Sequence, residues 1–263
     1  MSDLHLDLES GKPEFDPVKN AQKAMRTVLP RRFYKLSEAV ETELGFAIQL
    51  DGRTAKTSGR KPLVLPTRAL AQLVAAEFDA QQEFIDPFSM PVLRIVNPAI
   101  DSVSGLMDEV RSDIANYAGT DLLCYRAAEP EKLINRQNSA WNPIIARVEH
   151  EIGGRFILAE GVMHVAQLAL TLEAFATKLA AATPDAFTLS ATHVLTSLSG
   201  SAIVSLSLTS GWLSTADAWS AAHLDEDWTI EFWGEDLEAS ARRAKRLIEF
   251  EAAANVIAAI RQA

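Results

Sequence analysis

Cysteine is nearly absent from this 263-residue sequence, in which Cys124 is the single copy. One cysteine cannot form a disulfide within the chain, so a disulfide framework is excluded and a reducing compartment is the simpler expectation. Cys124 lies between Leu123 and Tyr125 on a predicted strand, with no evident activating base. This setting predicts a buried thiol rather than a reactive one.

The sequence also lacks the motifs that hold metals and phosphates. Its five histidines are scattered, with no His-x-x-x-His pair and no second cysteine to complete a ligand set. No Gly-Lys-Ser or Gly-Lys-Thr occurs, and the glycines never form a phosphate-binding run. We therefore expect no metal site and no nucleotide site of known type.

Long apolar runs are missing as well. The longest lie around residues 201–208, and they are too short and too rich in serine to span a bilayer. Residues 1–30 carry several acidic side chains and no uninterrupted apolar core, unlike a transit peptide or a secretory signal. We expect no integral membrane association and a cytoplasmic location.

Positive charge is in deficit, because 25 Lys and Arg face 35 Asp and Glu, for a net charge of −10. This balance argues against nucleic acid and against an anionic membrane surface, both of which attract basic proteins. The hydrophobic share of 48% is that of an ordinary globular protein with a substantial core.

A convincing catalytic constellation is also lacking. The hydroxyl-rich segment 196–201 lies near His193 and His223 in the chain, but Gly-x-Ser-x-Gly is absent, and Ser and Gly in an apolar helical run usually mark close helix packing. Paired acids between residues 225 and 231 leave open a carboxylate-based hydrolase or lyase, since two carboxyl groups in contrasting environments can supply an acid and a base.

The patterns that are present predict an α+β protein. Residues 1–30 form a polar tail, in which 18–28 can be a short helix. Residues 31–91 predict a small antiparallel β-rich domain, with strands over 33–36, 45–50, 53–57 and 62–66, an Asp51-Gly52 turn, and a helix capped by Thr67 that runs to about Gln82.

Residues 92–263 predict a larger, mostly helical domain. Two extended segments, 121–126 and 155–164, either connect helices or pair with the first sheet. The predicted helices cover 92–100, 104–118, 130–152, 167–181, 187–209, 214–232 and 236–261, with Ser214 and Asp217 as a capping pair.

The most unusual stretch is 224–238, which holds seven carboxylates, two Trp and a Phe, and no Lys or Arg. Read as a helix, it has one apolar stripe of Leu224, Trp228 and Phe232 and a second of Ile230, Trp233 and Leu237. Apolar stripes are usually core, so the residues alone favour a helix buried on two sides. The alternative is that one stripe, with its acids, faces a partner protein.

Several segments together resemble one family. In chain order they are 32–35 (RFYK), 50–53 (LDGR) with Lys56-Thr57, 62–66 (PLVLP), 76–81 (AEFDAQ), 85–87 (IDP), Met90-Pro91, 120–126 (TDLLCYR), Arg136-Gln137, 141–143 (WNP), 160–163 (EGVM), 198–201 (LSGS) and the 224–238 stretch. Their joint order resembles the ATP synthase assembly factors of the ATP-twelve type, from about Arg31 to about Ala253. Phe78 and Asn142 depart from the Trp and Asp that are usual in that family.

The resemblance implies a small β-rich domain followed by a helical one, in agreement with the patterns above. It implies a chaperone that binds the unassembled alpha subunit of the F-type ATP synthase catalytic sector and prevents its aggregation before it pairs with beta, without catalysis or cofactor. Acids after Leu224 are functionally important in the family, and by resemblance that role falls on Asp225 or Glu226.

We therefore expect a partner-binding site rather than an active site. A general holdase for unfolded proteins is the nearest alternative to the alpha-specific chaperone, beside the carboxylate enzyme. The expected partner-binding residues are Asp225, Glu226, Asp227, Trp228, Glu231, Phe232 and Trp233.

Overall fold

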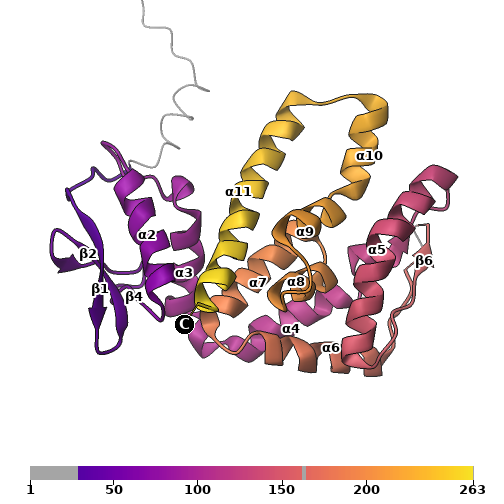
Figure 1. Cartoon of the computed structure of the whole chain (residues 1–263), viewed down its shortest axis with the longest axis horizontal. Coiled ribbons are helices and arrows are strands. Elements are labelled where there is room, and N and C mark those ends of the chain that lie inside the picture. The colour runs from indigo at the N-terminus through magenta and orange to yellow at the C-terminus, as the bar shows by residue number, and fades with distance from the viewer. Residues whose placement is uncertain (1–28, 162–163, 263) are drawn as a thin grey trace, which may run out of the picture.

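The computed structural model describes residues 29–161 and 164–262, in which a small antiparallel sheet is followed by a larger set of helices (Figure 1). The α+β class predicted from the sequence is confirmed. The predicted helix at 18–28 and most of the predicted tail lie outside the described residues. The domain division at residue 91 stays a prediction, since one cluster of buried apolar side chains includes residues from both parts, such as Ile48 and Phe250.

The sheet is built around β2 (Gly45–Leu50), which pairs antiparallel with β1 (Ser37–Thr42), β3 (Arg53–Thr54) and β4 (Val64–Leu65). Ile48 and Leu50 of β2 are buried on one face, as the predicted alternation requires, but Ala47 on the opposite face is buried as well and Phe46 is half-buried. Asp51 and Gly52 both have positive φ and turn the chain from β2 into β3, which confirms the predicted turn.

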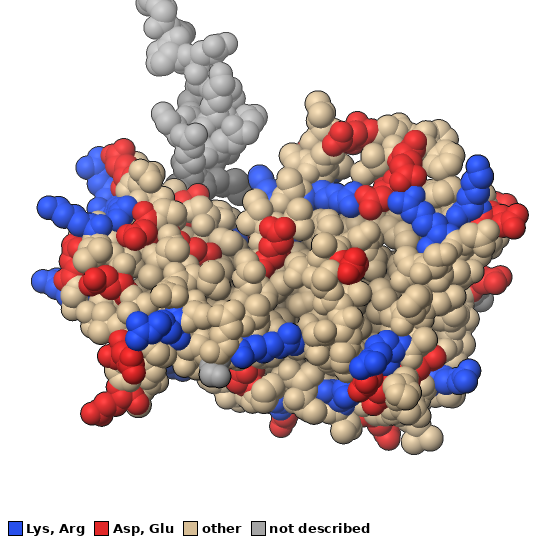
Figure 2. All heavy atoms as spheres, viewed as in Figure 1, with Lys and Arg blue, Asp and Glu red and all other residues tan. Residues whose placement is uncertain are grey.

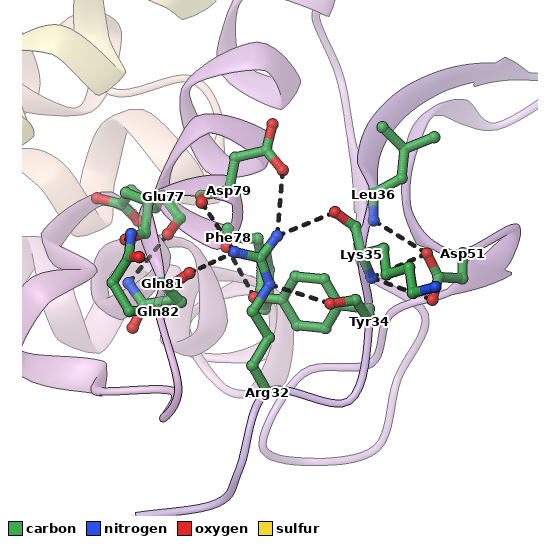
Figure 3. Close-up of polar contacts among 11 residues, drawn as sticks. Arg32, Tyr34, Lys35, Leu36, Asp51, Glu77, Phe78, Asp79, Gln81 and Gln82 are labelled. Atoms are coloured by element: carbon green, nitrogen blue, oxygen red, sulfur yellow. Dashed lines mark hydrogen bonds and ion pairs between the residues drawn. The ribbon is translucent and has the colours of Figure 1, made fainter.

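The strand predicted at residues 33–36 is wrong, and the true strand begins at Ser37. The amides of Lys35 and Leu36 donate to the side chain of Asp51, at 2.9–3.1 Å. The Arg32 guanidinium donates hydrogen bonds to the carbonyls of Tyr34 and Lys35, both at 3.0 Å (Figure 3). Because these backbone groups bind side chains, they are not available for a strand ladder.

Helix α2 (Arg68–Ala80) covers the sheet and links it to the rest of the molecule. Thr67 caps it, as predicted, by accepting from the amide of Leu70, and the same hydroxyl donates to the carbonyl of Ala259 near the end of the chain. Glu77 of α2 accepts from the amides of Val92 and Leu93, at 2.7 and 2.8 Å, and thereby caps the next helix. These bonds join α2 to the end of the chain near Ala259 and to the helix that follows Met90.

The helical part is organised around α7, which packs against α3, α4, α8 and α11. Within residues 29–161 and 164–262, no helix is long and apolar enough to cross a membrane. The helices are α3 (Pro91–Asp101), α4 (Met107–Ala118), α5 (Glu131–Ile152), α6 (Ala169–Ala182), α7 (Ala186–Ser199), α8 (Ala202–Thr209), α9 (Thr215–Ala222), α10 (Leu224–Trp233) and α11 (Leu237–Ile260), with short 3-10 turns at Pro87–Ser89, Val103–Gly105 and Leu122–Cys124.

The single helix predicted over 187–209 is wrong, because the chain breaks it at Gly200. Gly200 has φ +67° and ends α7, and Ser201 then caps α8 by accepting from the amide of Val204. Asp121, fully buried, accepts from the amides of Leu123 and Ile203 and from the Ser201 hydroxyl at 2.7 Å. Burial outweighs these bonds and raises the pKa of Asp121 to about 6.

Two short strands, β5 (Tyr125–Arg126) and β6 (Ala159–Glu160), pair with each other in parallel. The extended segments at 121–126 and 155–164 therefore do not join the first sheet. Cys124 lies on the 3-10 turn before β5 rather than on a strand, and it is buried as predicted. Burial is the main reason that the pKa of its thiol rises to about 12.

Candidate functional site

The stretch 224–238 lies in a helical hairpin that projects from the body of the molecule (Figure 1). We call residues 224–249 the arm: α10, the connection at Gly234–Asp236, and the first half of α11. Leu224 is the single buried residue of α10, and the buried residues of α11 begin at Phe250. The arm is therefore held at its base and exposed along most of its length.

The helix predicted over 214–232 is two helices, because the chain turns at His223. Ser214 caps α9, and its hydroxyl donates to Asp217, as predicted. At the end of α9 the His223 ring stacks on Trp219, with 3.6 Å between centroids, and its Nδ1 bonds the Trp219 carbonyl at 2.9 Å. Burial is the main cause that lowers the pKa of His223. The stacked pair fixes the point from which α10 leaves the body.

The apolar side chains at the end of the arm face solvent. Phe232, Trp233 and Leu237, which we call the arm tip, are 61%, 88% and 84% exposed. Trp228 is half-buried against Phe232, with ring centroids 4.5 Å apart, and Ile230 is also half-buried. The expectation of a helix buried on two sides is therefore wrong, because Leu224 at its base is the single buried residue of α10.

The carboxylates of α10 pair with arginines of this same chain. Asp227 contacts Arg243, Glu226 lies 3.3 Å from Arg246, and Glu231 lies 2.7 Å from Arg136. Figure 2 accordingly shows acidic and basic side chains side by side over the arm. Such pairs on the surface contribute ~0–1 kcal/mol each to stability, so a cationic partner can displace them at little cost.

Asp225 differs from its neighbours because it bonds an amide rather than an arginine. Its Oδ1 accepts from Gln137 Nε2 on α5 at 2.8 Å, and Gln137 is itself buried. Two of the seven predicted partner-binding residues, Asp225 and Glu231, thus meet adjacent residues of α5, Gln137 and Arg136. Arg136 and Gln137 belong to the segments that carry the family resemblance, but no sequence pattern predicts that they contact α10.

A hollow of about 610 Å³ opens between α10 and α11. Asp225, Glu226 and Ile230 line it on one side, and Arg242, Arg243 and Arg246 on the other. The carboxylate-enzyme alternative requires an acid and a base in contrasting environments. Glu226 and Asp227 instead share Arg243 as a neighbour, at 4.0 Å from Glu226, so this geometry counts against that alternative.

The buried serine hydroxyls of segment 196–201, considered above as candidate nucleophiles, lie in the interface between two helices. Ser199, Ser201 and Ser205 are all buried between α7 and α8. The hydroxyls of Ser199 and Ser205 bond each other and the Ser201 carbonyl, and the Ser201 hydroxyl donates to Asp121 and accepts from the Val204 amide. His193 lies on the exposed side of α7, where its Nε2 is 3.0 Å from Asp113. The serines and the histidine therefore do not form a nucleophile–base pair within the described chain.

Comparison with known proteins places these features in a family context. A model described as ATP12 chaperone protein matches residues 31–149, which include the sheet and most of α5. The mitochondrial protein atp12 of Schizosaccharomyces pombe is 26% identical over 217 residues, or 78% of this chain and 74% of that protein.

Solved structures extend the similarity over nearly the whole chain. The Atu1473 protein from Agrobacterium tumefaciens is 48% identical with a TM-score of 0.84, covering 93% of this chain and 91% of its own. Atp12 from Paracoccus denitrificans is 37% identical with a TM-score of 0.80, covering 87% of this chain and 97% of its own. The sequence and the fold therefore agree with these relatives well beyond the residues that the family model matches.

Proposed function

The chain belongs to the ATP12 family of ATP synthase assembly chaperones, and from that premise we propose that it binds the unassembled alpha subunit of the catalytic sector through its arm. The alpha subunit before assembly exposes an apolar surface that beta later covers. A chaperone that buries this surface reversibly competes with aggregation and can still be displaced by beta. No bond is made or broken in this activity.

The observation that carries the proposal is the exposed arm tip. Trp233 and Leu237 are among the most exposed large apolar side chains in the described residues, and with Phe232 they are clustered within six positions of the chain. Exposed apolar patches of this kind mark interaction sites. Aromatic side chains such as Trp are also the ones that dominate binding energy at interfaces.

The tip alone is too small for a stable complex. A standard interface buries about 800 Å² per partner, and an aromatic side chain contributes roughly 150–250 Å² of that. The flanks of the arm, with Trp228 and the acids Glu226, Asp227 and Glu231, supply the next surface. We propose that basic residues of the alpha subunit replace Arg243, Arg246 and Arg136 as the partners of these acids. The new ion pairs would set the register of the complex.

The proposal is tested with the unmodified protein. Unfolded alpha subunit is diluted into buffer with and without the chaperone, and light scattering reports aggregation. We expect suppression at near-equal molar ratio, together with a complex of the two chains on size-exclusion chromatography. Failure to suppress alpha-subunit aggregation would contradict the proposal.

Two comparison clients distinguish this function from that of a general holdase. Isolated beta subunit and an unrelated aggregating enzyme are diluted in the same way. A specific chaperone suppresses aggregation of alpha and leaves both controls unaffected, whereas a holdase protects all three. Equal protection of all three proteins would favour the holdase.

A further inference from the structure

A buried cation lies beneath the base of the arm. Arg126 on β5 is only 7% exposed, and its guanidinium stacks over the Trp141 ring at 5.2 Å. Its Nε donates to the Leu123 carbonyl and its Nη1 to Asn138, at 2.8 and 3.1 Å. The remaining nitrogen, Nη2, is buried without a hydrogen-bond partner in the described residues. A charge in this position is costly unless an anion lies close enough to balance it.

Gln137 connects this buried region to α10. Its Oε1 accepts from the amide of Ala127, next to Arg126, at 2.9 Å, and its Nε2 donates to Asp225 at 2.8 Å. Gln137 is 2% exposed, so both ends of its amide are used inside the protein. One side chain on α5 thus bonds both the segment after β5 and the first turn of α10.

Trp141 provides a second attachment one turn along α5. Its Nε1 donates to the carbonyl of Ala221 at 2.8 Å, just before the His223 turn. The two α5 side chains therefore hold the chain on either side of the junction between α9 and α10. The direction in which the arm projects depends on both bonds.

Among the α10 acids, Asp225 is the one that is joined to the segment of Arg126, through the two hydrogen bonds of Gln137. Glu226 and Asp227 face arginines of α11, and Glu231 faces Arg136 at the surface. Burial lowers the pKa of Arg126, and the Asp225 carboxylate is among the charges that oppose this effect. An Arg126 without that carboxylate would be a poorly compensated charge inside the protein.

We infer that Asp225 is a positioning residue: through Gln137 it fixes the base of α10 on α5, and with its charge it balances Arg126, so that the arm tip is held in one orientation. This inference rests on the proposed function of the arm and assigns Asp225 an indirect part in it. Glu226, Asp227 and Glu231, whose partners are at the surface, remain the acids that contact the client.

The test is a double-mutant cycle between Asp225→Asn and Arg126→Met. The Asn side chain can still accept from Gln137 but carries no charge. We expect Asp225→Asn to raise the chaperone concentration needed for half-suppression by at least about fivefold in the native background, and by less than about twofold in the Arg126→Met background, because neighbouring groups couple and independent ones do not. An equal loss in both backgrounds would show that Asp225 contacts the client directly and would overturn the inference.

A second cycle covers the case in which Arg126→Met does not fold. Asp225→Ala is compared alone and in a Gln137→Ala background, where the connection to α5 is already lost. The inference expects little further loss in the second background. As a matched acid, Glu226→Gln is expected to lower activity equally in the native and Gln137→Ala backgrounds.

A client-free measurement separates this inference from the proposed function. Spin labels at Ser139→Cys on α5 and Glu235→Cys in the connection between α10 and α11 report the arm's orientation as an interlabel distance. Cys124 is buried and does not compete for label. We expect a single narrow distribution in the otherwise native protein and a broader or displaced one with Asp225→Asn. An unchanged distribution would overturn the inference even if client binding is confirmed, and a changed one would support it even if the alpha subunit is not the client.

Discussion

Replacing one leucine of the arm tip by serine should weaken client binding while leaving the fold intact. Leu237 is 84% exposed at the start of α11, so its side chain contributes little to the core. Exposed substitutions of this kind change the free energy of unfolding by about 0.5 kcal/mol or less. Burying a leucine at an interface contributes about 1.5–3 kcal/mol. Each 1.4 kcal/mol is about tenfold in affinity, so Leu237→Ser should weaken binding by roughly 10- to 100-fold.

Leu44 offers a matched control, because it is 87% exposed in the turn between β1 and β2, in the other part of the molecule. Leu44→Ser and Leu237→Ser make the same chemical change at the same exposure. The assay compares the chaperone concentration that half-suppresses alpha-subunit aggregation, with thermal unfolding of each variant as the check on folding. If both variants lose activity equally, or if neither does, the arm tip is not the apolar contact and the reasoning fails.

Three further predictions concern the body of the protein. The folded pKa of Asp121 is raised from 3.8 to about 6, so the protonated carboxyl group contributes stability that is fully present below about pH 4 and is lost as the pH rises through 6. The free energy of unfolding of the native protein, relative to that of Asp121→Asn, should therefore fall over that range by up to about 3 kcal/mol. Cys124, with a thiol pKa of about 12, should react with a thiol reagent at pH 7–8 only when the protein unfolds. Gly45→Ala should destabilise by about 1–3 kcal/mol, since φ is +125° and a Cβ would lie 2.5 Å from the Leu65 carbonyl oxygen.

Each of these has a control within the chain. Urea unfolding at several pH values measures the Asp121 effect, and a difference that stays constant from pH 4 to pH 7 would contradict it. Thiol labelling of native and urea-unfolded protein tests Cys124, and rapid labelling of the native protein would refute its burial. Gly52→Ala shares the positive φ of Gly45→Ala but meets no atom within 4 Å, so it should cost less; equal losses would contradict the steric argument.

Local elements of the fold were largely predictable from the sequence. Gly45–Leu50 alternates in hydrophobicity and is a strand, and Thr67 is followed by a regular apolar face and caps a helix. Both predictions depend on residues that are close in the chain. The strand at 33–36 failed because the amides of Lys35 and Leu36 bind the side chain of Asp51, which lies 15 or 16 positions further along the chain.

The residues at the Gly200 break were compatible with two interpretations. Gly followed by Ser can end one helix and cap the next, but the same residues also suit close helix packing. No sequence pattern indicated the turn at His223, because the turn depends on the stack with Trp219 and on bonds from α5.

The exposure of the arm depends on contacts that no local sequence pattern specifies. Hydrophobic periodicity identified the stripes that contain Trp228, Phe232 and Trp233, but it reports only which side chains share a face. Whether that face is covered depends on distant elements. The bonds from Arg136 and Gln137 to α10 join residues 95 and 88 positions apart, and nothing local in either segment specifies them.

Helix α11 gives the arm a long lever. Its C-terminal half, from Phe250 to Ala259, is enclosed by the body and accepts a bond from Thr67, while its N-terminal half carries the tip. The exposed half of α11, residues 237–249, is about 20 Å long at 1.5 Å per residue, so a tilt of about 5° at the point where it leaves the body moves the tip by roughly 2 Å. A load applied at the tip is thus transmitted along α11 to α3 and α7, against which the helix packs, and a small tilt there becomes a larger displacement where the client would be held.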